Sequence, residues 1–376
     1  MKVLILTPTF PDSPESWKGI FVKEQTNSIL KEHEVCVVKT SVDYSKFHLF
    51  LKRTLVKDIR FDYPVYRISV CKSIPIYNQL NYFFSAFLEL KKIIKSYQPD
   101  IIHCHYSYPS GIIASLIKWK YKIPFVVTEH TRIKTTFRSF FHKKLSIWAM
   151  NKSFKVIAVS NSLKGEILEE GVKNVTVIPN VVEVEKFTLA SSATNPFTIG
   201  FLGSLNTHNK GLGVLLNACV GLPFPFKLKI GGGGILLEYY KDLARELGID
   251  KSCVFCGNVN QNEVVAFYND LNTFVLASKY ETFGIVLVEA LSCGIPVIAT
   301  NCGGPLDVVN QFNGVIIDVD NPAQLNNALV NVFNNYHEYS RIEIRKYVNN
   351  NFSPKSFLEK INHLYNECIN HQPFNN

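Results

Sequence analysis

The chain has 376 residues, of which 47% are hydrophobic and 19% charged, so it is long enough for two domains and too apolar to be intrinsically disordered. Its net charge of +9 is unevenly placed. Residues 1–190 carry 28 basic and 16 acidic side chains, whereas residues 191–376 carry 12 and 15. The first half, at +12, is expected to meet an anionic partner, with a merely solvated basic surface as the alternative. No nucleic-acid-binding motif supports DNA or RNA as that partner.

The apolar run between Lys2 and Thr7 is too short for a signal peptide or a membrane span, so we expect a cytoplasmic protein. Nine cysteines, an odd number scattered through apolar segments, predict reduced thiols rather than a disulfide framework. Cys253 and Cys256 have the spacing of a zinc-binding pair but lack a second pair. We therefore expect no zinc site at this pair.

In chain order, the first half alternates short apolar runs with helical patterns. Strands are predicted at 2–6, 35–39, 101–104, 125–128, 156–159 and 175–178, and helices at 21–31, 81–96, 111–119 and 162–170. Repeated strand, crossover helix and parallel strand predict an α/β fold with a doubly wound parallel sheet. Ligands of such sheets bind beyond the carboxyl ends of the strands.

The pattern stops near Pro179 and resumes at Phe197. We predict an N-terminal Rossmann-like domain at 1–180, a linker at 181–196 and a second Rossmann-like domain at 197–352. Strands of the second domain are predicted at 197–202, 227–230, 253–256, 273–277, 296–299 and 315–317. The segment 353–376 contains a helical pattern and is expected to pack back on the first domain. Two such domains facing a cleft suit a reaction that joins two separately held substrates.

The most informative stretch follows the predicted strand at 273–277. A short loop carrying Glu281 leads into a helix that begins near Gly284 and Ile285 and contains Glu289 in an almost entirely apolar neighbourhood. A carboxylate in such surroundings is costly unless it is hydrogen-bonded, so Glu289 is expected to have hydroxyl partners. At the helix start, free backbone N–H groups and the helix dipole can receive phosphate oxygens.

The stretch at 278–296 resembles the E-x7-E signature of glycosyltransferase family four, whose members are retaining enzymes of GT-B fold. The resemblance implies that Glu281 contacts the hydroxyls of a donor sugar and that Glu289 holds the ribose hydroxyls of the nucleotide. Gly284 and Ile285 lie between them at the donor. The Phe-Gly, Glu-Ala and Gly-x-Pro companions of the two glutamates make the match specific. Satisfied structural carboxylates are the alternative.

Other donor-binding residues follow neighbouring strands. The segment with Gly203, Ser204 and Lys210 resembles the family's segment in which an Arg after the Gly, and a Lys six residues later, neutralise the donor diphosphate. Lys210 matches, but Ser204 stands at the Arg position. This departure implies weaker leaving-group stabilisation, or a basic substitute from the facing domain. Outside this context, a lone Lys before Gly is usually a solvated loop charge.

Two glycine-rich turns follow further strands of the second half. Gly303 and Gly304 resemble the family's turn at the donor phosphates. The run at 231–234 is either a site of close backbone approach or a bare tight turn, and it lacks the spacing of a dinucleotide fingerprint.

In the first domain, candidate residues lie past the predicted strand ends. Gly19 closes a long loop that resembles the family's glycine-containing N-terminal loop, and His105, Glu129 and His130 follow two strands. The resemblance implies a cleft at these residues and a catalytic contact of His130 with donor sugar or acceptor. Alternation along 103–105 points the two histidines one way and the cysteine the other. A single histidine is more often structural, but three at strand ends of one sheet favour a site.

One basic segment at 132–148 interleaves charged with apolar residues at helical spacing. It is either a helix that buries its apolar stripe in the domain or a basic amphipathic helix on an anionic membrane. It could also recognise a lipid-diphosphate acceptor. Its basic residues are Arg132, Lys134, Arg138, Lys143 and Lys144, and its apolar ones are Phe137, Phe140, Phe141, Leu145 and Trp148.

The resemblance implies a retaining, hexosyltransferase-type glycosyltransferase of polysaccharide biosynthesis that needs no metal and no cofactor. We expect it to be cytoplasmic and peripheral at the inner face of the membrane. Its partners would be a nucleotide sugar and a glycan or lipid-diphosphate-linked acceptor. Two alternatives from other classes stay open. One is a catalytically silent nucleotide-sugar-binding subunit, suggested by Ser204, and the other is a GT-B-type sugar-nucleotide epimerase.

Overall fold

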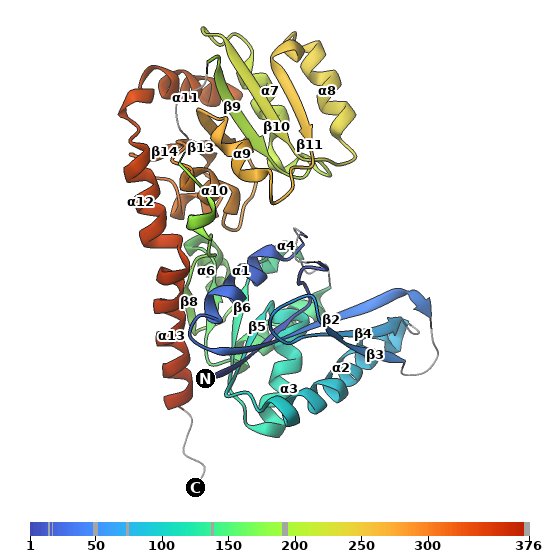
Figure 1. Ribbon diagram of the computed structural model, residues 1–376. Helices are drawn as coiled ribbons and strands as arrows, with labels where there is room; N and C mark the ends of the chain where they lie inside the picture. The colour runs from blue at the N-terminus through green and yellow to red at the C-terminus, as the bar shows by residue number, and fades with distance from the viewer. Residues whose placement is uncertain are drawn as a thin grey trace. The chain divides into compact units, whose positions relative to one another are not determined.

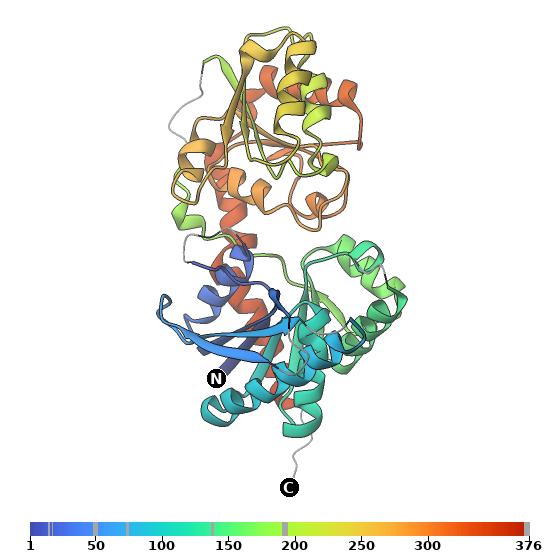
Figure 2. The same cartoon turned by 90° about the vertical axis from the view of Figure 1, so that its right-hand side faces the viewer.

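The computed structural model describes residues 1–13, 16, 18–47, 52–72, 75–136, 139–189 and 195–371 (Figures 1 and 2). The chain divides into two compact units. The first comprises Met1–Pro179 with the described residues from Phe357 on, and the second comprises Asn180–Ser356. The linker boundaries at 181 and 196 and the start of the C-terminal segment at 353 stay predictions. Residues 190–194 and 372–376 lie outside the described residues.

The first unit is built on an eight-stranded sheet of order β3-β4-β2-β1-β5-β6-β7-β8. Its described strand pairs are parallel except β3 with β4. The six strands predicted in this half are confirmed, and two others join them. The strands are β1 (Lys2–Thr7), β2 (Glu34–Phe47), β3 (Arg53–Asp58), β4 (Val65–Lys72), β5 (Ile101–His105), β6 (Phe125–Glu129), β7 (Val156–Ala158) and β8 (Val175–Val177).

Helices cover both faces of this sheet (Figure 1). Alternate strand residues, among them Leu4, Val38 and Cys104, pack against α2 and α3 in one apolar cluster. On the opposite face Tyr365 of α13 is hydrogen-bonded to His103 of β5. The helices are α1 (Ile20–Ile29), α2 (Pro75–Tyr97), α3 (Ile112–Tyr121), α4 (Ile133–Thr136), α5 (Phe140–Lys152), α6 (Asn161–Glu169) and α13 (Pro354–Asn370), with a π-helical turn at Ser107–Gly111.

The β2–β4 region differs from the prediction. The strand expected at 35–39 continues to Phe47, with β4 parallel beside it and β3 antiparallel at the edge (Figure 1). In β4, Ile68 and Val70 are buried, whereas Arg67 and Ser69 are partly exposed. This alternation is typical of a strand with one covered and one open face.

The second unit contains a six-stranded parallel sheet of order β11-β10-β9-β12-β13-β14. All six strands predicted for this half are confirmed: β9 (Phe197–Leu202), β10 (Phe226–Gly231), β11 (Cys253–Gly257), β12 (Thr273–Leu276), β13 (Val297–Thr300) and β14 (Gly314–Ile317).

One face of this sheet packs against helices through an apolar cluster that includes Ile199, Leu228, Leu215, Tyr240 and Leu329. Of the helices of this unit, the sequence analysis located only the one that begins near Gly284 and Ile285. The helices of the unit are α7 (Leu212–Cys219), α8 (Leu237–Glu246), α9 (Val264–Asn269), α10 (Ile285–Ser292), α11 (Pro322–Asn334) and α12 (Arg341–Phe352).

Candidate active site

In the second unit, the loops after β9, β12 and β13 contact one another at the carboxyl edge of the sheet. The loop after β9 carries Lys210 at the end of a short 3-10 turn. The backbone N–H of Lys279 donates to the Asn209 carbonyl at 2.7 Å, and the Asn209 side-chain amide donates to the Tyr280 carbonyl at 3.1 Å. These bonds fix Lys210 beside the segment that carries Glu281.

The loop after β13 holds the backbone of Glu281 from another direction. The Glu281 N–H donates to the Cys302 carbonyl at 3.3 Å, and its carbonyl accepts from the N–H of Gly304 at 2.8 Å. A Cβ at Gly304 would lie 2.4 Å from the backbone of Phe283. Only glycine permits this approach. Gly303 forms an isolated bridge with Glu281, so the predicted donor turn adjoins the predicted catalytic glutamate.

Lys210 and Glu281 form an ion pair. The Lys210 Nζ lies 2.5 Å from the Glu281 Oε2, and the two side chains are 29% and 15% exposed. The aliphatic stem of Lys210 passes over Gly203, where a Cβ would come within 3.3 Å of it. A partly shielded, charge-assisted contact orients both groups while leaving them within reach of a ligand. Two of the three residues predicted to be catalytic therefore lie in direct contact.

Ser204, the departure from the family pattern, is exposed on the same loop. Behind it, the Gly203 N–H donates to the Gly231 carbonyl at 3.0 Å. The glycine run at 231–234 therefore lies against the backbone of the β9 loop, where a Cβ at Gly232 would come 1.9 Å from the Gly203 carbonyl oxygen. Its role in close approach to a donor stays a prediction.

Glu289 lies on α10, the helix that begins at Ile285 after Gly284. Its side chain is buried, and the Tyr268 hydroxyl of α9 donates to Glu289 Oε2 at 2.8 Å. The expected hydroxyl partner is thus confirmed. Burial, together with the negative charge of Glu289, raises the pKa of Tyr268 well above its ordinary value. Tyr268 therefore stays protonated and can donate this bond throughout the physiological pH range.

Gly211 offers a test of how firmly the Lys210 loop is fixed. It has φ 72° and a Cβ there would lie 1.8 Å from the Ala277 carbonyl oxygen, so Gly211→Ala forces the loop away from β12. We expect a loss of about 2 kcal/mol in unfolding free energy beyond that of Gly248→Ala. Gly248 has φ 70° and open space around it, so it measures the left-handed backbone cost alone. Equal losses in urea unfolding would contradict the tight docking.

In the first unit, three histidine rings form a column at the carboxyl edge of the sheet. The rings of His103 and His105 stack with centroids 4.8 Å apart, and those of His105 and His130 at 5.3 Å. His105 Nδ1 and His130 Nε2 are hydrogen-bonded at 3.0 Å. His103 contacts Thr128 Oγ1 at 2.7 Å and Tyr365 Oη at 2.6 Å. The prediction that both β5 histidines share one face of the sheet is confirmed.

The column is electrically neutral at physiological pH. Burial lowers the pKa of His103 and of His130 to about 3, and it lowers the pKa of His105 well below its ordinary value. His130 lies at the end of the column and retains slight exposure. It can therefore serve as a neutral hydrogen-bonding group rather than as a cation.

This burial predicts that the first unit loses stability as pH falls below about 6.5. Because the folded pKa values are lowered, the unfolded chain binds more protons between pH 6.5 and about 3. Each such histidine contributes about 1.4 kcal/mol per pH unit in that range. In urea unfolding between pH 5 and 7, His103→Gln should flatten the slope, and the exposed-site control His363→Gln should not. Identical slopes for wild type and His103→Gln would refute the prediction.

Glu129 is buried beside this column, and both its oxygens are engaged. Oε1 accepts from the backbone N–H of His130 and from the N–H and hydroxyl of Thr131, and Oε2 accepts from the N–H and hydroxyl of Ser107. Glu129 therefore organises the turn that carries His130. A direct contact with an acceptor, as the sequence analysis expected, would require one of these bonds to break.

Gly19 lies at the same edge as His130. It precedes the first residue of α1 with φ 76°, and the ring of Phe21, in the first turn, lies 4.5 Å from the His130 ring. Residues 14, 15 and 17 of the predicted loop lie outside the described residues. The structure brings Gly19, His105, Glu129 and His130 to one edge of one sheet.

A family sequence model described as "Glycosyl transferases group 1" matches residues 161–351, and one described as "Glycosyltransferase Family 4" matches residues 21–186. The chain belongs to this glycosyltransferase family. The resemblance inferred from residues 278–296 is thereby confirmed.

Sequence relatives support this family assignment, and a solved structure supports the fold. The glycosyltransferase is 31% identical over 329 residues to an uncharacterized glycosyltransferase of Methanocaldococcus jannaschii, covering 81% of this chain and 88% of the relative. It is 29% identical over 251 residues to the capsular polysaccharide biosynthesis glycosyltransferase CapM of Staphylococcus aureus, and the match covers 59% of this chain and 63% of CapM. The Anabaena protein HepE, solved in complex with UDP, aligns with TM-score 0.77 at 17% identity over 98% of this chain and 100% of that one. The predicted GT-B fold is confirmed.

The basic segment at 132–148 corresponds to α4 and α5, with residues 137 and 138 outside the described part. Phe140 and Phe141 are 71% and 63% exposed, so the interpretation as a buried apolar stripe is wrong for these positions. The helix instead buries Ser146, Ala149 and Met150. Three of the basic residues of the segment form ion pairs at α6 and its C-cap: Arg132 with Glu166, Lys134 with Glu169, and Lys143 with Glu170.

Within the described residues of this glycosyltransferase, no helix has the length and apolar character needed to cross a bilayer. The same residues include no group of three or more His, Cys, Asp or Glu side chains placed to hold a metal ion. The nine cysteines, all in the described part, are free thiols, and seven of them are buried.

Several site residues were missed by the sequence analysis. Asn209 clamps the Lys210 loop, and Tyr268 binds Glu289, but a loop amide and a tyrosine in an apolar helix carry no distinctive signal. Cys302 is a buried thiol whose electrostatic environment includes Lys210 and Glu281, and burial raises its pKa. Its position one residue before Gly303 was the available signal.

Proposed function

We propose that this glycosyltransferase is a retaining hexosyltransferase of polysaccharide biosynthesis. It would move a sugar from a nucleoside-diphosphate-sugar to a hydroxyl of a lipid-linked or growing glycan acceptor. The observation that carries the proposal is the Lys210–Glu281 ion pair at the carboxyl edge of the second unit, with Glu289 buried on the helix that follows. The complexes of HepE with UDP and with UDP-glucose support a nucleotide-sugar donor, and the similarity to CapM of capsular polysaccharide biosynthesis supports a glycan acceptor.

Donor binding would exchange the partners of this ion pair. A diphosphate oxygen replaces the Glu281 carboxylate at Lys210, which frees that carboxylate to accept hydrogen bonds from sugar hydroxyls. Backbone N–H groups at the start of α10, near Gly284 and Ile285, add positive potential for the diphosphate. Glu289 binds the ribose hydroxyls. Both groups keep hydrogen-bond partners throughout, because Lys210 gains a diphosphate oxygen and Glu281 gains the sugar hydroxyls.

The reaction breaks the bond between the anomeric carbon of the sugar and the diphosphate oxygen. Lys210 and the helix N–H groups stabilise the negative charge that develops on this oxygen, an electrostatic contribution that is usually the largest in such catalysis. The acceptor hydroxyl forms the new bond on the same face of the sugar, and its proton passes to the leaving phosphate. The configuration at the anomeric carbon is thereby retained.

The proposal requires neither metal nor cofactor, because Lys210 and the α10 terminus supply the positive potential at the diphosphate. On the acceptor side, His130 would accept or donate a hydrogen bond as a neutral ring. Its place beside Phe21 of α1 and its fixed turn, held by Glu129, suit a group that orients a hydroxyl.

We further propose that the enzyme works at the inner face of the cell membrane. Exposed Phe140 and Phe141 on α5 and exposed Trp119 on α3 support a peripheral contact with lipid. The basic charge of the first half of the chain, +12, would favour an anionic surface.

One observation favours a second candidate function. The family's Arg is Ser204 here, and its hydroxyl is exposed beside Asn206, whose amide donates to it at 3.0 Å. A donor site with one cation in place of two suits a subunit that binds nucleotide sugars without turning them over.

An assay with a panel of nucleotide sugars, with and without membrane lipid extract, separates these functions. Transfer that requires the extract, with a product whose anomeric configuration matches the donor by NMR, supports the proposal. Binding without turnover would identify the silent subunit, and isomerised donor would identify an epimerase.

A further inference from the structure

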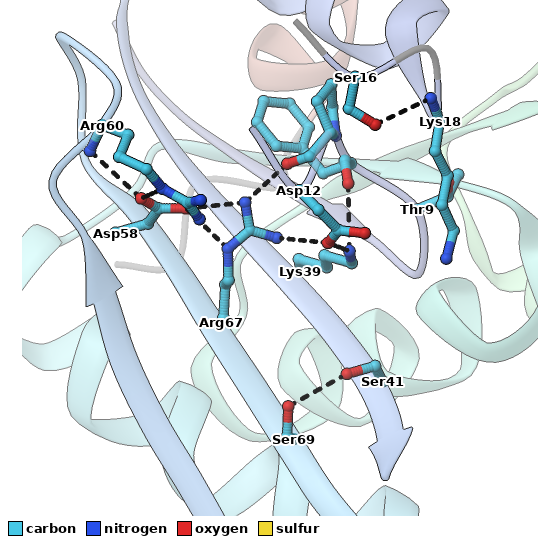
Figure 3. Close-up of polar contacts among 12 residues, drawn as sticks. Thr9, Asp12, Ser16, Lys18, Lys39, Ser41, Asp58, Arg60, Arg67 and Ser69 are labelled. Carbon is cyan, nitrogen blue, oxygen red and sulfur yellow. Dashed lines mark hydrogen bonds and ion pairs between the residues drawn. The ribbon is translucent and has the colours of Figure 1, made fainter. Parts of the chain in front are cut away.

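A cluster of charged side chains lies in the first unit at the end of β1, and we call it the Asp12 network: Asp12, Lys39, Asp58, Arg60 and Arg67. Lys39 of β2 is paired with Thr7 of β1 and with Arg67 of β4 in the strand register. The two cations thus lie side by side at the level where β1 ends, and Figure 3 shows both pointing at Asp12.

The contacts of the network are short. Lys39 Nζ lies 2.5 Å from Asp12 Oδ1 and donates to the Phe10 carbonyl at 3.1 Å. Arg67 Nη1 lies 3.3 Å from the same Asp12 oxygen, and its Nη2 donates to the Pro11 carbonyl at 2.6 Å. Two cations, Lys39 and Arg67, therefore contact the same carboxylate oxygen of Asp12.

The two carboxylates of the network are held differently. Asp58 is buried and accepts from both Arg60 and Arg67 at 2.7 to 2.8 Å. Asp12 is 61% exposed although its partners Lys39 and Arg67 are only 9% and 17% exposed. The cations are thus built into the sheet, and Arg67 is also paired with the buried Asp58 at 2.7 Å. The one carboxylate that both cations share, Asp12, comes from a surface loop. A buried cation needs a partner, but any oxyanion can supply it.

The network shares a face of the sheet with the histidine column. Residues paired across parallel strands point to the same side, and the register pairs Ile5 with Val37 on one strand and with His103 on the other. Two residues on, Lys39 and His105 therefore lie on that same face, near the carboxyl edge. The opposite face, with Val38, packs against helices.

Farther along the same two strands the open face stays polar. The hydroxyls of Ser41 and Ser69 lie 3.2 Å apart, two residues beyond Lys39 and Arg67 (Figure 3). The exposed amine of Lys18 adds positive charge near Asp12 and Lys39. Lys18, Lys39, Arg60 and Arg67 outnumber Asp12 and Asp58, so the surface retains positive charge even with both carboxylates in place.

From this arrangement we infer that Lys39 and Arg67 form an oxyanion subsite that takes a carboxylate or phosphate group of the acceptor in place of Asp12. The inference rests on the proposed function and specifies it: the acceptor is acidic. Arg67 offers the planar N–H groups that match such oxyanions, and Lys39 offers a point charge. Because one anion replaces another, binding adds no unpaired charge to the edge of the sheet.

The test uses the full chain and two probes, inorganic phosphate and D-glucuronate, with D-glucose as a neutral probe. The dissociation constant of each is obtained from thermal-shift titrations. Asp12→Asn removes the internal competitor and should tighten binding of at least one anion about tenfold, whereas Arg67→Met should weaken it about tenfold. Arg53→Met is the matched control. Arg53 of β3 donates to Glu89 at 2.6 Å. It is paired with Val70, which belongs to the opposite, helix-covered face of the sheet.

The outcomes are distinct. Tightening by Asp12→Asn for phosphate assigns a phosphate group to the acceptor, and tightening for glucuronate assigns a carboxylate. Unchanged anion affinity in Asp12→Asn, or equal affinity for glucose, overturns the subsite even if Arg67→Met fails to fold. If Lys210→Ala abolishes phosphate binding and Asp12→Asn leaves it unaltered, the phosphate binds to the second unit. That result also overturns the subsite. UDP is titrated in parallel to test the donor site. If the wild-type chain binds the anions but not UDP, the proposed function is refuted and the oxyanion subsite is not.

Discussion

Lys210→Ala is expected to lower turnover about 100-fold or more, which corresponds to about 2.7 kcal/mol in the activation free energy. The loop that carries this ammonium is already fixed by the Asn209 clamp before the donor binds, so Lys210 needs little reorientation when the diphosphate replaces Glu281. Alanine at this position removes the positive charge just where the leaving diphosphate becomes more negative.

The fold should survive this substitution, because a partly exposed ion pair contributes about 1 kcal/mol or less to stability. The matched control is Lys279→Ala. Lys279 is part of the same clamped loops, but its amine is paired with Asp320 at 2.7 Å and both side chains are about half exposed. We expect near wild-type turnover for the control. Steady-state kinetics with saturating donor decide the matter, and an unchanged kcat in Lys210→Ala would remove the proposed role.

Much of the donor side could be predicted because its information is local. Each strand is a short apolar run and each loop follows it directly, and the rule that parallel strands present their carboxyl ends at one edge brings Lys210 and Glu281 together. The direct ion pair and the Tyr268–Glu289 bond could not be predicted. They depend on how loops dock and on which apolar helix lies behind α10, and spacing along the chain encodes neither.

The Asp12 network shows the opposite case. Lys39 interrupts an apolar run, and β4 alternates buried with polar residues, Ile68 and Val70 against Arg67 and Ser69. That alternation is a readable strand signal. The sequence does not reveal the register that pairs Lys39 with Arg67. Between them in the chain lies β3, whose length and direction set that register. Long-range pairing, not local propensity, makes the cluster.

Of the two interpretations of the basic segment, the buried apolar stripe is wrong at Phe140 and Phe141 for a related reason. Helical spacing marks a stripe that can be buried, but it does not say which stripe the domain covers. In this helix the small residues Ser146 and Ala149 meet the core, and Phe140 and Phe141 remain outside. Met150 is buried on the same side of the helix. Which stripe is covered depends on how the neighbouring elements pack against the helix, and the sequence alone does not reveal that packing.

Glu289→Ala is expected to weaken UDP binding about 100-fold, the second large effect. Hydrogen bonds to a charged group contribute about 1.5 to 3 kcal/mol, and a carboxylate can accept from both ribose hydroxyls. The substitution also leaves the buried Tyr268 hydroxyl without this acceptor, so a stability loss of about 1 to 3 kcal/mol should accompany the loss of affinity. The two effects must therefore be separated.

Tyr268→Phe separates them, because it removes the buried hydrogen bond but leaves the Glu289 carboxylate in place. If Glu289 binds the nucleotide, calorimetry with UDP should show affinity within about threefold of wild type for Tyr268→Phe and the full loss for Glu289→Ala. If Glu289 were only a structural carboxylate, both variants would lose stability in thermal unfolding while UDP affinity stayed the same. Because the phenylalanine ring preserves the packing against Phe274, whose centroid lies 5.5 Å away, a change in affinity in Glu289→Ala alone reports on the carboxylate itself.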